Sequence, residues 1–468
     1  MKKRFTLIVT ALTLLALLLP ACAAPAPAPK VVEKEVVVTA TPAAPPTPTP
    51  LPPGVTKITF WHAMGGVRTP FIARMVDDFN LTHPGIVVSV EFKGSYRDTL
   101  NATIAAARAG NPPHVVQVFE IGTLENIDSG IFVPVEDLTK PGEVLWEDFL
   151  DPVLNYYRIG GKLYSMPWNS SNPVLYYNKT IFKKAGLDPE KPPQTFEEVL
   201  EYGRKIKESG AAEAAITWPL HSWFFEQWMA DMGQDLVDQD NGRSGRATKI
   251  NLDSDAAKRI FEWWKQLYDE GLWVNPGLEA WGPARQNFIS GTTAMLISST
   301  SDVTQMEIAA TEQGFELGTG FIPIPADLKR HGVVIGGASL WITKDHPQEE
   351  LEAAKEFVLW MAEPAQQIRW HQGTGYFPIR KSAVDVLELT GWFDTHPTYR
   401  AAFDQLMATE PIPATQGALI GRFREVRSII EEAVEKVITG AASVDDALAE
   451  AKAKCEKEIA EYERVVGQ

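Results

Sequence analysis

Residues 57–119 decide the fold class and read KITFWHAMGGVRTPFIARMVDDFNLTHPGIVVSVEFKGSYRDTLNATIAAARAGNPPHVVQVF. Three apolar stretches typical of strands alternate here with two stretches typical of helices, and the apolar stretches span 57–61, 86–92 and 114–119. Thr69 and Pro70 stand where the first helix is expected to begin, because threonine caps free amides and proline fits the first turn. The order strand, helix, strand, helix, strand predicts a parallel sheet covered by helices.

The remainder of the chain continues the same mixture of strands and helices. Thr195 and Glu198 have the spacing of a capping box before a helix. A further apolar strand is predicted over 293–297, and long helices are predicted over 351–361 and 443–466. The chain is 45% hydrophobic and 22% charged, so it has enough apolar content and length for two cores. We therefore expect an α/β protein with two lobes around a cleft.

The first 21 residues have the pattern of a secretory signal peptide. A basic start at Lys2, Lys3 and Arg4 precedes an apolar run over 7–19 that is too short to span a bilayer. Cys22 follows at once, and the residues that end with it resemble a bacterial lipobox, in which the cysteine is acylated and becomes the mature N-terminus. The sequence therefore predicts export followed by attachment of a lipid.

Residues 22–54 combine this cysteine with a proline-rich linker. Proline, alanine and threonine dominate the segment, so it cannot bury much apolar surface and favours an extended polyproline geometry. We expect the lipid on Cys22 to anchor the folded body to a membrane. The predicted location is extracytoplasmic, in a periplasm or on the outer face of the cytoplasmic membrane.

Cysteine content and net charge narrow the function classes. Cys22 and Cys455 are the only cysteines, so acylation of the first leaves no disulfide framework. The formal net charge of −16 repels nucleic acid, and we expect no nucleic-acid partner.

Six short sequence motifs in the part of the chain after the linker resemble those of a known family. They are Phe60-Trp61-His62, Gly94-Ser95-Tyr96, Gln117-Val118-Phe119-Glu120, the run from Pro167 to Lys179 (PWNSSNPVLYYNK), the run from Ile335 to Trp341 (IGGASLW) and the run from Trp370 to Tyr376 (WHQGTGY). In this order the strings resemble the glycerol-3-phosphate-binding subunits of ABC importers, which are members of solute-binding family 1. The likeness runs from Trp61 to about Gly440.

The resemblance implies a type II periplasmic-binding-protein fold, in which two α/β lobes enclose a cleft and the chain crosses the hinge three times. We place the crossings near 166–171, 336–340 and 378–382. The N-terminal lobe then comprises 55–167 with about 338–378, and the C-terminal lobe about 168–337 with 379–468. The resemblance further implies a monomer that needs no cofactor, binds a small ligand and docks on the membrane subunits of an importer.

The family's ligand contacts carry over onto seven positions of this chain. They are Tyr96, Glu120, Ser171, Ser299, Gly337, Tyr376 and Arg427. A phosphate monoester needs several donors and at least one cation, and the resemblance gives the cationic role to the planar guanidinium of Arg427. The hydroxyls and the backbone N–H of Gly337 supply further donors, whereas Glu120 can accept from the glycerol hydroxyls.

Other interpretations of the same residues stay open at this point. Arg427 could instead pair with Glu431 one helical turn further on. Trp61, Trp168 and Trp223 are candidate cleft aromatics, which leaves a sugar receptor as the main alternative. Trp223 could also shape a pocket for glycerophosphodiesters, with a choline group against aromatic faces.

An exported glycosidase is the alternative from another class. Such an enzyme needs two carboxyl groups across the scissile bond, and the matched strings offer no partner acid for Glu120. The sequence contains neither a His-Glu-x-x-His metal motif nor a Gly-x-Ser-x-Gly nucleophile elbow. His62, His221 and His371 lack metal-ligand spacing. We therefore expect a binding protein with no catalytic residues and no metal.

Replacing the cysteine at the predicted lipidation site tests the anchor. Cys22→Ala should release the protein from membranes, because an extended proline-rich segment has no membrane affinity of its own. Membrane fractionation after cleavage of the signal peptide measures this, and a variant that stays with the membranes would exclude lipid on Cys22 as the attachment.

Overall fold

The computed structural model describes residues 53–466. The predicted signal peptide, Cys22 and all but the end of the linker lie outside these residues. Within residues 53–466, none of the helices is both long enough and apolar enough to cross a membrane.

The first three strands of the first sheet come from residues 56–119. Strands β1, β2 and β3 pair in parallel in the order β2-β1-β3, as the pattern predicted, and span Thr56–His62, Ile86–Phe92 and Val115–Phe119. Strand β13, Gly336–Thr343, adds to β3 in the antiparallel sense and also pairs with β4, Phe132–Val133, and β7, Met166–Ser171. The main helices that cover this first sheet are α2 (Arg68–Thr82), α3 (Tyr96–Arg108) and α14 (Gln348–Met361).

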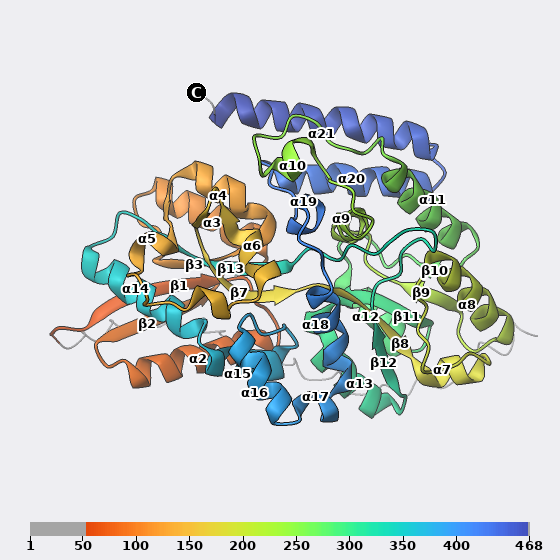
Figure 1. The fold of residues 1–468 in the computed structure, drawn as a ribbon, viewed down its shortest axis with the longest axis horizontal. Helices are drawn as coiled ribbons and strands as arrows, with labels where there is room; N and C mark the ends of the chain where they lie inside the picture. Colours follow the sequence, from red (N-terminus) through yellow and green to blue (C-terminus); the bar gives the residue numbers. More distant parts are fainter. Residues whose placement is uncertain (1–52, 467–468) are drawn as a thin grey trace, which may run out of the picture. The chain divides into compact units, whose positions relative to one another are not determined.

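The second sheet has the order β10-β9-β11-β8-β12. Its strands are β8 (Pro173–Asn178), β9 (Ala214–Thr217), β10 (Trp273–Val274), β11 (Thr293–Ser299) and β12 (Leu317–Gly320). The helices packed on it include α8 (Phe196–Ser209), α11 (Asp255–Asp269) and α12 (Trp281–Ile289), and α9 (Ser222–Asp231) packs on α11. Figure 1 shows the two sheets next to each other, the first at the left and the second at the right. The predicted α/β class is confirmed.

The chain passes from the first sheet to the second through one residue. Strand β7 ends at Ser171 and β8 begins at Pro173, so only Asn172 lies between them. The Asn172 side chain donates to the carbonyl of Ala402 at 2.8 Å, and its backbone N–H donates to Thr300 Oγ1 at 3.2 Å. The chain returns to the first sheet between β12 and β13. The predicted lobe boundaries stay a prediction.

The C-terminal part of the chain is helical. It contains α15 (Pro364–Thr374), α16 (Lys381–Leu389), α18 (Arg400–Met407), α20 (Phe423–Ile438) and α21 (Val444–Val466). Helices α20 and α21 pack on each other and on α11, above the second sheet in Figure 1. The predicted long helices over 351–361 and 443–466 are therefore confirmed.

Local capping signals predicted one helix start correctly and placed another two residues too late. Thr195 and Glu198 form the capping box of α8, as predicted. Helix α2, however, begins at Arg68, and the hydroxyl of Thr69 donates to the carbonyl of Met64 at 2.6 Å. Thr69 thus fastens the preceding loop and does not cap the helix.

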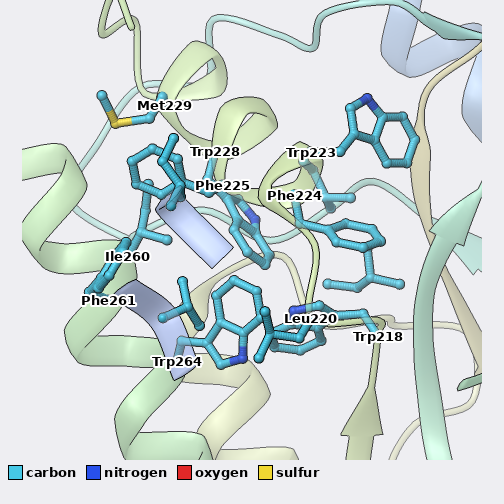
Figure 2. Packing of buried hydrophobic residues seen from close by; sticks show 14 of the residues in the cluster. Trp218, Leu220, Trp223, Phe224, Phe225, Trp228, Met229, Ile260, Phe261 and Trp264 are labelled. Carbon is cyan, nitrogen blue, oxygen red and sulfur yellow. The ribbon is translucent and has the colours of Figure 1, made fainter. Parts of the chain in front are cut away.

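Tryptophans and phenylalanines fill the interior of the second sheet region. Trp218 stacks on Trp263 with ring centroids 5.5 Å apart, and Trp228 meets Trp263 edge to face at 5.2 Å. Figure 2 shows this cluster between α9 and α11, with Trp223 at its margin. Most of the tryptophan content therefore serves packing, because a buried indole removes a large apolar area from water.

Trp168 belongs to the interior of the first sheet region and does not form a cleft wall. Its ring is fully buried, stacks on Trp370 at 4.8 Å and contacts Phe60 edge to face at 6.0 Å. This differs from the prediction of a cleft aromatic. Because residues alternate sides along β7, Trp168 points into the core.

Replacing this tryptophan should leave a large cavity. We expect Trp168→Ala to lower the free energy of unfolding by about 3–5 kcal/mol. Leu389→Ala is the matched control, since Leu389 is 86% exposed and its loss should change stability by less than about 0.5 kcal/mol. Equilibrium denaturation measures both, and equal small effects would contradict the packing described here.

Candidate functional site

One cavity brings together all seven positions carried over from the resemblance. It has a volume of about 520 Å³. Its lining includes Tyr96, Glu120, Ser171, Ser299, Gly337, Tyr376 and Arg427. These residues are spread over more than three hundred positions of sequence, so only the tertiary fold can assemble them.

Strand ends and helix starts place these side chains. Glu120 comes directly after β3, at the carboxyl end of a parallel strand, where ligands of α/β sheets bind. Ser171 and Ser299 are the last residues of β7 and β11. Tyr96 opens α3, and its ring stacks on Phe119 at 5.4 Å.

Arg427 is held by two carboxylates from separate parts of the fold. Its Nε and Nη2 each donate to a carboxylate oxygen of Glu226, at 2.7 Å in both cases. Nη2 also donates to Glu120 at 2.9 Å. The alternative pairing with Glu431 is not formed. The ion group of Arg427, Glu120 and Glu226 thus links α20, α9 and the end of β3.

Burial and pairing act in opposite directions in this group. Burial raises the pKa of Glu120, and the Arg427 guanidinium opposes that rise. Burial lowers the pKa of Arg427, but the two carboxylates outweigh it and raise that pKa above its ordinary value. Arg427 therefore stays charged, and with both carboxylates ionised the group carries a net charge of −1.

Glu431 lies beside this group and has its own partners. It accepts the backbone N–H of Ser222 at 3.0 Å and lies 3.3 Å from Nδ1 of His221. Burial raises the pKa of Glu431 to about 7. Burial and the charge of Arg427 lower the pKa of His221 well below its ordinary value, so this histidine is neutral at neutral pH.

A second charged group in the cavity was missed from the sequence. Arg68 and Arg285 both approach Asp302, with nitrogen-to-oxygen distances of 3.8 Å and 3.2 Å. Ser298 Oγ donates to the same carboxylate at 2.6 Å. Two guanidiniums and one carboxylate give this group a net charge of +1. Arg68 follows the carboxyl end of β1 by six residues, and that position was the one available signal.

Hydroxyls and a glycine line the cavity between the two charged groups. Ser299 Oγ accepts from the backbone N–H and the hydroxyl of Ser301, at 3.2 and 3.0 Å, so its own proton is free to point elsewhere. Gly337 has φ +95°, and a Cβ there would lie 1.9 Å from the carbonyl oxygen of Asn169. Only glycine fits this backbone position.

The two tyrosines lie near each other and connect the charged groups. Burial raises the pKa of Tyr96 well above its ordinary value, and the neighbouring Tyr376 and Glu120 add to the rise. The Arg68 guanidinium lies over the Tyr376 ring, 5.7 Å from its centroid. The Tyr96 phenol therefore remains neutral and can donate or accept a hydrogen bond.

The aromatic lining differs in part from the prediction. Trp223 lines the cavity as expected, together with Trp281, whose ring centroid is 6.0 Å away. Trp61 is half-buried beneath Lys93, whose Nζ is 3.8 Å from the ring centroid, and neither Trp61 nor Trp168 is part of the lining. Both point away from the cavity because of the side on which their strands place them.

Two groups within the described residues could offer three ligands each to a metal ion. They are His221 with Glu279 and Glu431, and His114 with His346 and Glu350. In the first group, Nδ1 of His221 already accepts a hydrogen bond from the backbone N–H of Trp223 at 3.0 Å. In the second, Nε2 of His114 faces Glu350 at 2.9 Å. These hydrogen bonds account for both arrangements.

Sequence comparison identifies the family. The model of the bacterial extracellular solute-binding protein family matches residues 74–401. The chain belongs to this family. It is 33% identical over 402 residues to the sn-glycerol-3-phosphate-binding periplasmic protein UgpB of Escherichia coli (strain K12), covering 84% of this chain and 90% of that protein. The identity to the protein of the same name from Shigella dysenteriae serotype 1 is 32% over 400 residues.

Solved structures of solute-binding proteins share the fold. UgpB from Mycobacterium tuberculosis, in complex with glycerophosphocholine, superposes with a TM-score of 0.72 at 23% identity, over 88% of this chain and 100% of that one. The cyclic alpha-maltosyl-1,6-maltose binding protein from Arthrobacter globiformis gives 0.71 at 24%, over 86% and 99%. The predicted periplasmic-binding-protein fold is confirmed.

The raised pKa of Glu431 predicts how the free energy of unfolding changes with pH. Between pH 4.5, its ordinary pKa, and about 7, the unfolded chain has lost this proton while the folded protein keeps it. The group therefore destabilises the fold progressively as pH rises through this window. Glu431→Gln should remove the penalty, so its free energy of unfolding relative to the unmodified protein should rise by about 1–3 kcal/mol across the window.

Equilibrium denaturation at several pH values measures this difference. Glu435→Gln, an exposed position on the same helix, is the control and should show no such trend. A relative stability of Glu431→Gln that does not change with pH would contradict the raised pKa.

Proposed function

We propose that this protein captures sn-glycerol-3-phosphate outside the cytoplasm and delivers it to the membrane subunits of an ABC importer. The observation that supports this most is the convergence of the seven carried-over positions on one cavity. Hydroxyls, phenols and a glycine N–H gather there, and a phosphate monoester needs such an excess of donors. The relative at 33% identity, whose name gives the same ligand, supports the same assignment.

The ion group of Arg427, Glu120 and Glu226 fits the glycerol end of the ligand. Two acidic side chains already pair with the guanidinium, so a phosphate here would have to approach both of them. Glycerol hydroxyls can instead donate to Glu120 and accept from Arg427. We therefore replace the expectation that Arg427 faces the phosphate with the proposal that it orders the polyol.

Closure of the lobes on the ligand is part of the proposal. Tyr96 and Glu120 extend from the first sheet region, whereas Ser299 and Arg427 extend from the second. A ligand that contacts all four stabilises the closed arrangement, because only that arrangement offers every partner at once. We further propose that closure presents a surface to the importer, that the protein is a monomer, and that the lipid on Cys22 keeps it near the membrane.

Two wider ligand classes remain candidates because of the aromatic wall. Trp223 and Trp281 could cover a sugar face, which supports a receptor for a sugar or oligosaccharide as the second candidate. The same rings, beside the carboxylate of Glu279, could hold the cationic end of a glycerophosphodiester. The cavity volume of about 520 Å³ is large enough for such ligands.

Direct binding distinguishes these ligands. Titration of the purified protein with sn-glycerol-3-phosphate should give saturable binding with quenching or enhancement of tryptophan fluorescence, because Trp223 lines the cavity. Ligand recovered afterwards should be chemically unchanged. Binding of maltose without binding of the phosphate would favour the sugar receptor, and recovery of an altered ligand would show an enzyme.

A further inference from the structure

The group of Arg68, Arg285 and Asp302 has features that a purely structural ion pair lacks. Its net charge is +1, and all three residues line the cavity. The Asp302 side chain is only 4% exposed, while those of Arg68 and Arg285 are 25% and 24% exposed. The carboxylate is thus buried behind two guanidiniums that face the cavity. Excess positive charge in a partly buried site is stabilised by an anion.

Asp302 fixes the position of both arginines. It ends the 3-10 turn Thr300–Asp302 that follows β11, and its carboxylate accepts a hydrogen bond from the hydroxyl of Ser298 in that strand. Arg285 Nη1 donates to both carboxylate oxygens, at 3.2 and 3.3 Å. The carboxylate therefore holds two cations from different helices, α2 and α12, near one place.

Arg68 keeps a donor that no residue of 53–466 satisfies. Its Nη2 donates to the carbonyl of Ser301 at 2.6 Å, but its Nε is buried and makes no hydrogen bond within that range. A buried N–H without an acceptor costs about 1–3 kcal/mol. The described residues therefore satisfy the hydrogen-bonding capacity of Arg68 only in part, although its side chain is 25% exposed and lines the cavity.

We infer that Arg68 and Arg285 bind the phosphate group of the ligand, beside Ser299 and Tyr376. The inference rests on the proposed function and adds two specificity-determining residues to the seven carried over. Ser301 links Arg68 to Ser299, and the Arg68 guanidinium lies over the Tyr376 ring. The phosphate thus meets the group of charge +1, while the glycerol meets the Arg427 group of charge −1.

This arrangement selects a phosphate monoester by its second charge. A monoester gains that charge as pH rises through about 6, whereas a diester keeps a single charge. The two arginines should hold the doubly charged form more tightly. Affinity for sn-glycerol-3-phosphate should therefore rise with pH relative to affinity for a glycerophosphodiester, because both ligands share any effect of the titration of Glu431.

Calorimetric titration of the full-length mature protein tests the inference. The variants are Arg68→Ala and Arg285→Ala, and the matched control is Arg97→Ala. Arg97 lines the same cavity but lies near Glu279, with a nitrogen-to-oxygen distance of 3.8 Å. Each protein is titrated with sn-glycerol-3-phosphate and with glycerophosphocholine at about pH 5 and about pH 7.5, on either side of the second phosphate ionisation.

We expect each variant to lose about 10- to 100-fold in affinity for sn-glycerol-3-phosphate at the higher pH, by analogy with other charge-assisted hydrogen bonds. The variants should also lose most of the pH dependence that the unmodified protein shows. Arg97→Ala should keep both the affinity within about threefold, or 0.7 kcal/mol, and the pH dependence. Thermal unfolding checks that the variants fold, and Arg68→Lys and Arg285→Lys replace the alanine variants if they do not.

The outcomes separate this inference from the proposed function. If the unmodified protein binds sn-glycerol-3-phosphate but the variants keep its affinity and pH dependence, the phosphate lies elsewhere and the inference is wrong. If Arg97→Ala loses as much affinity for sn-glycerol-3-phosphate as the other two variants, the overall electrostatic potential of the cavity causes the loss. The inference about Arg68 and Arg285 is then wrong. If the unmodified protein binds no sn-glycerol-3-phosphate, the proposed function fails and the inference with it.

Discussion

The pairing of one buried guanidinium with two carboxylates is the interaction on which the site depends. Arg427, Glu120 and Glu226 come from three separate elements, and each side chain is nearly inaccessible to solvent. Removing the cation would leave two buried carboxylates, and breaking such pairs typically costs about 3–5 kcal/mol. The contacts of α20 with α9 and with the end of β3 are therefore coupled to the electrostatics of the cavity.

This coupling gives the cavity its polarity. The Arg427 group has an excess of negative charge, and the group around Asp302 has an excess of positive charge. Tyr96 and Tyr376 lie near each other in the lining of the same cavity. A ligand with an anionic end and a hydroxyl-bearing end would match this distribution in one orientation. The strongly negative surface of the protein matters less, because solvent and salt screen distant charges.

Short-range signals in the sequence predicted the elements and the family, but not the partners of the charged side chains. Thr195 with Glu198 specified a capping box, since both residues act within one turn. Glu226, by contrast, lies about two hundred positions from Arg427, and no local pattern indicates that they meet. The same holds for Arg68 with Asp302. The prediction for Trp168 failed for another reason. The sequence does not reveal toward which side of β7 this side chain points.

The crossing at Asn172 has a mechanical consequence. Ser171 pairs with Gly336 in the first sheet, and Pro173, two residues later, pairs with Ser299 in the second. Two hydroxyls of the cavity wall therefore belong to the pivot itself. Any rotation of one sheet against the other changes the gap between Ser171 and Ser299 in the same motion. A substitution that stiffens the backbone at Asn172 would therefore restrain the separation of these two hydroxyls without touching a ligand.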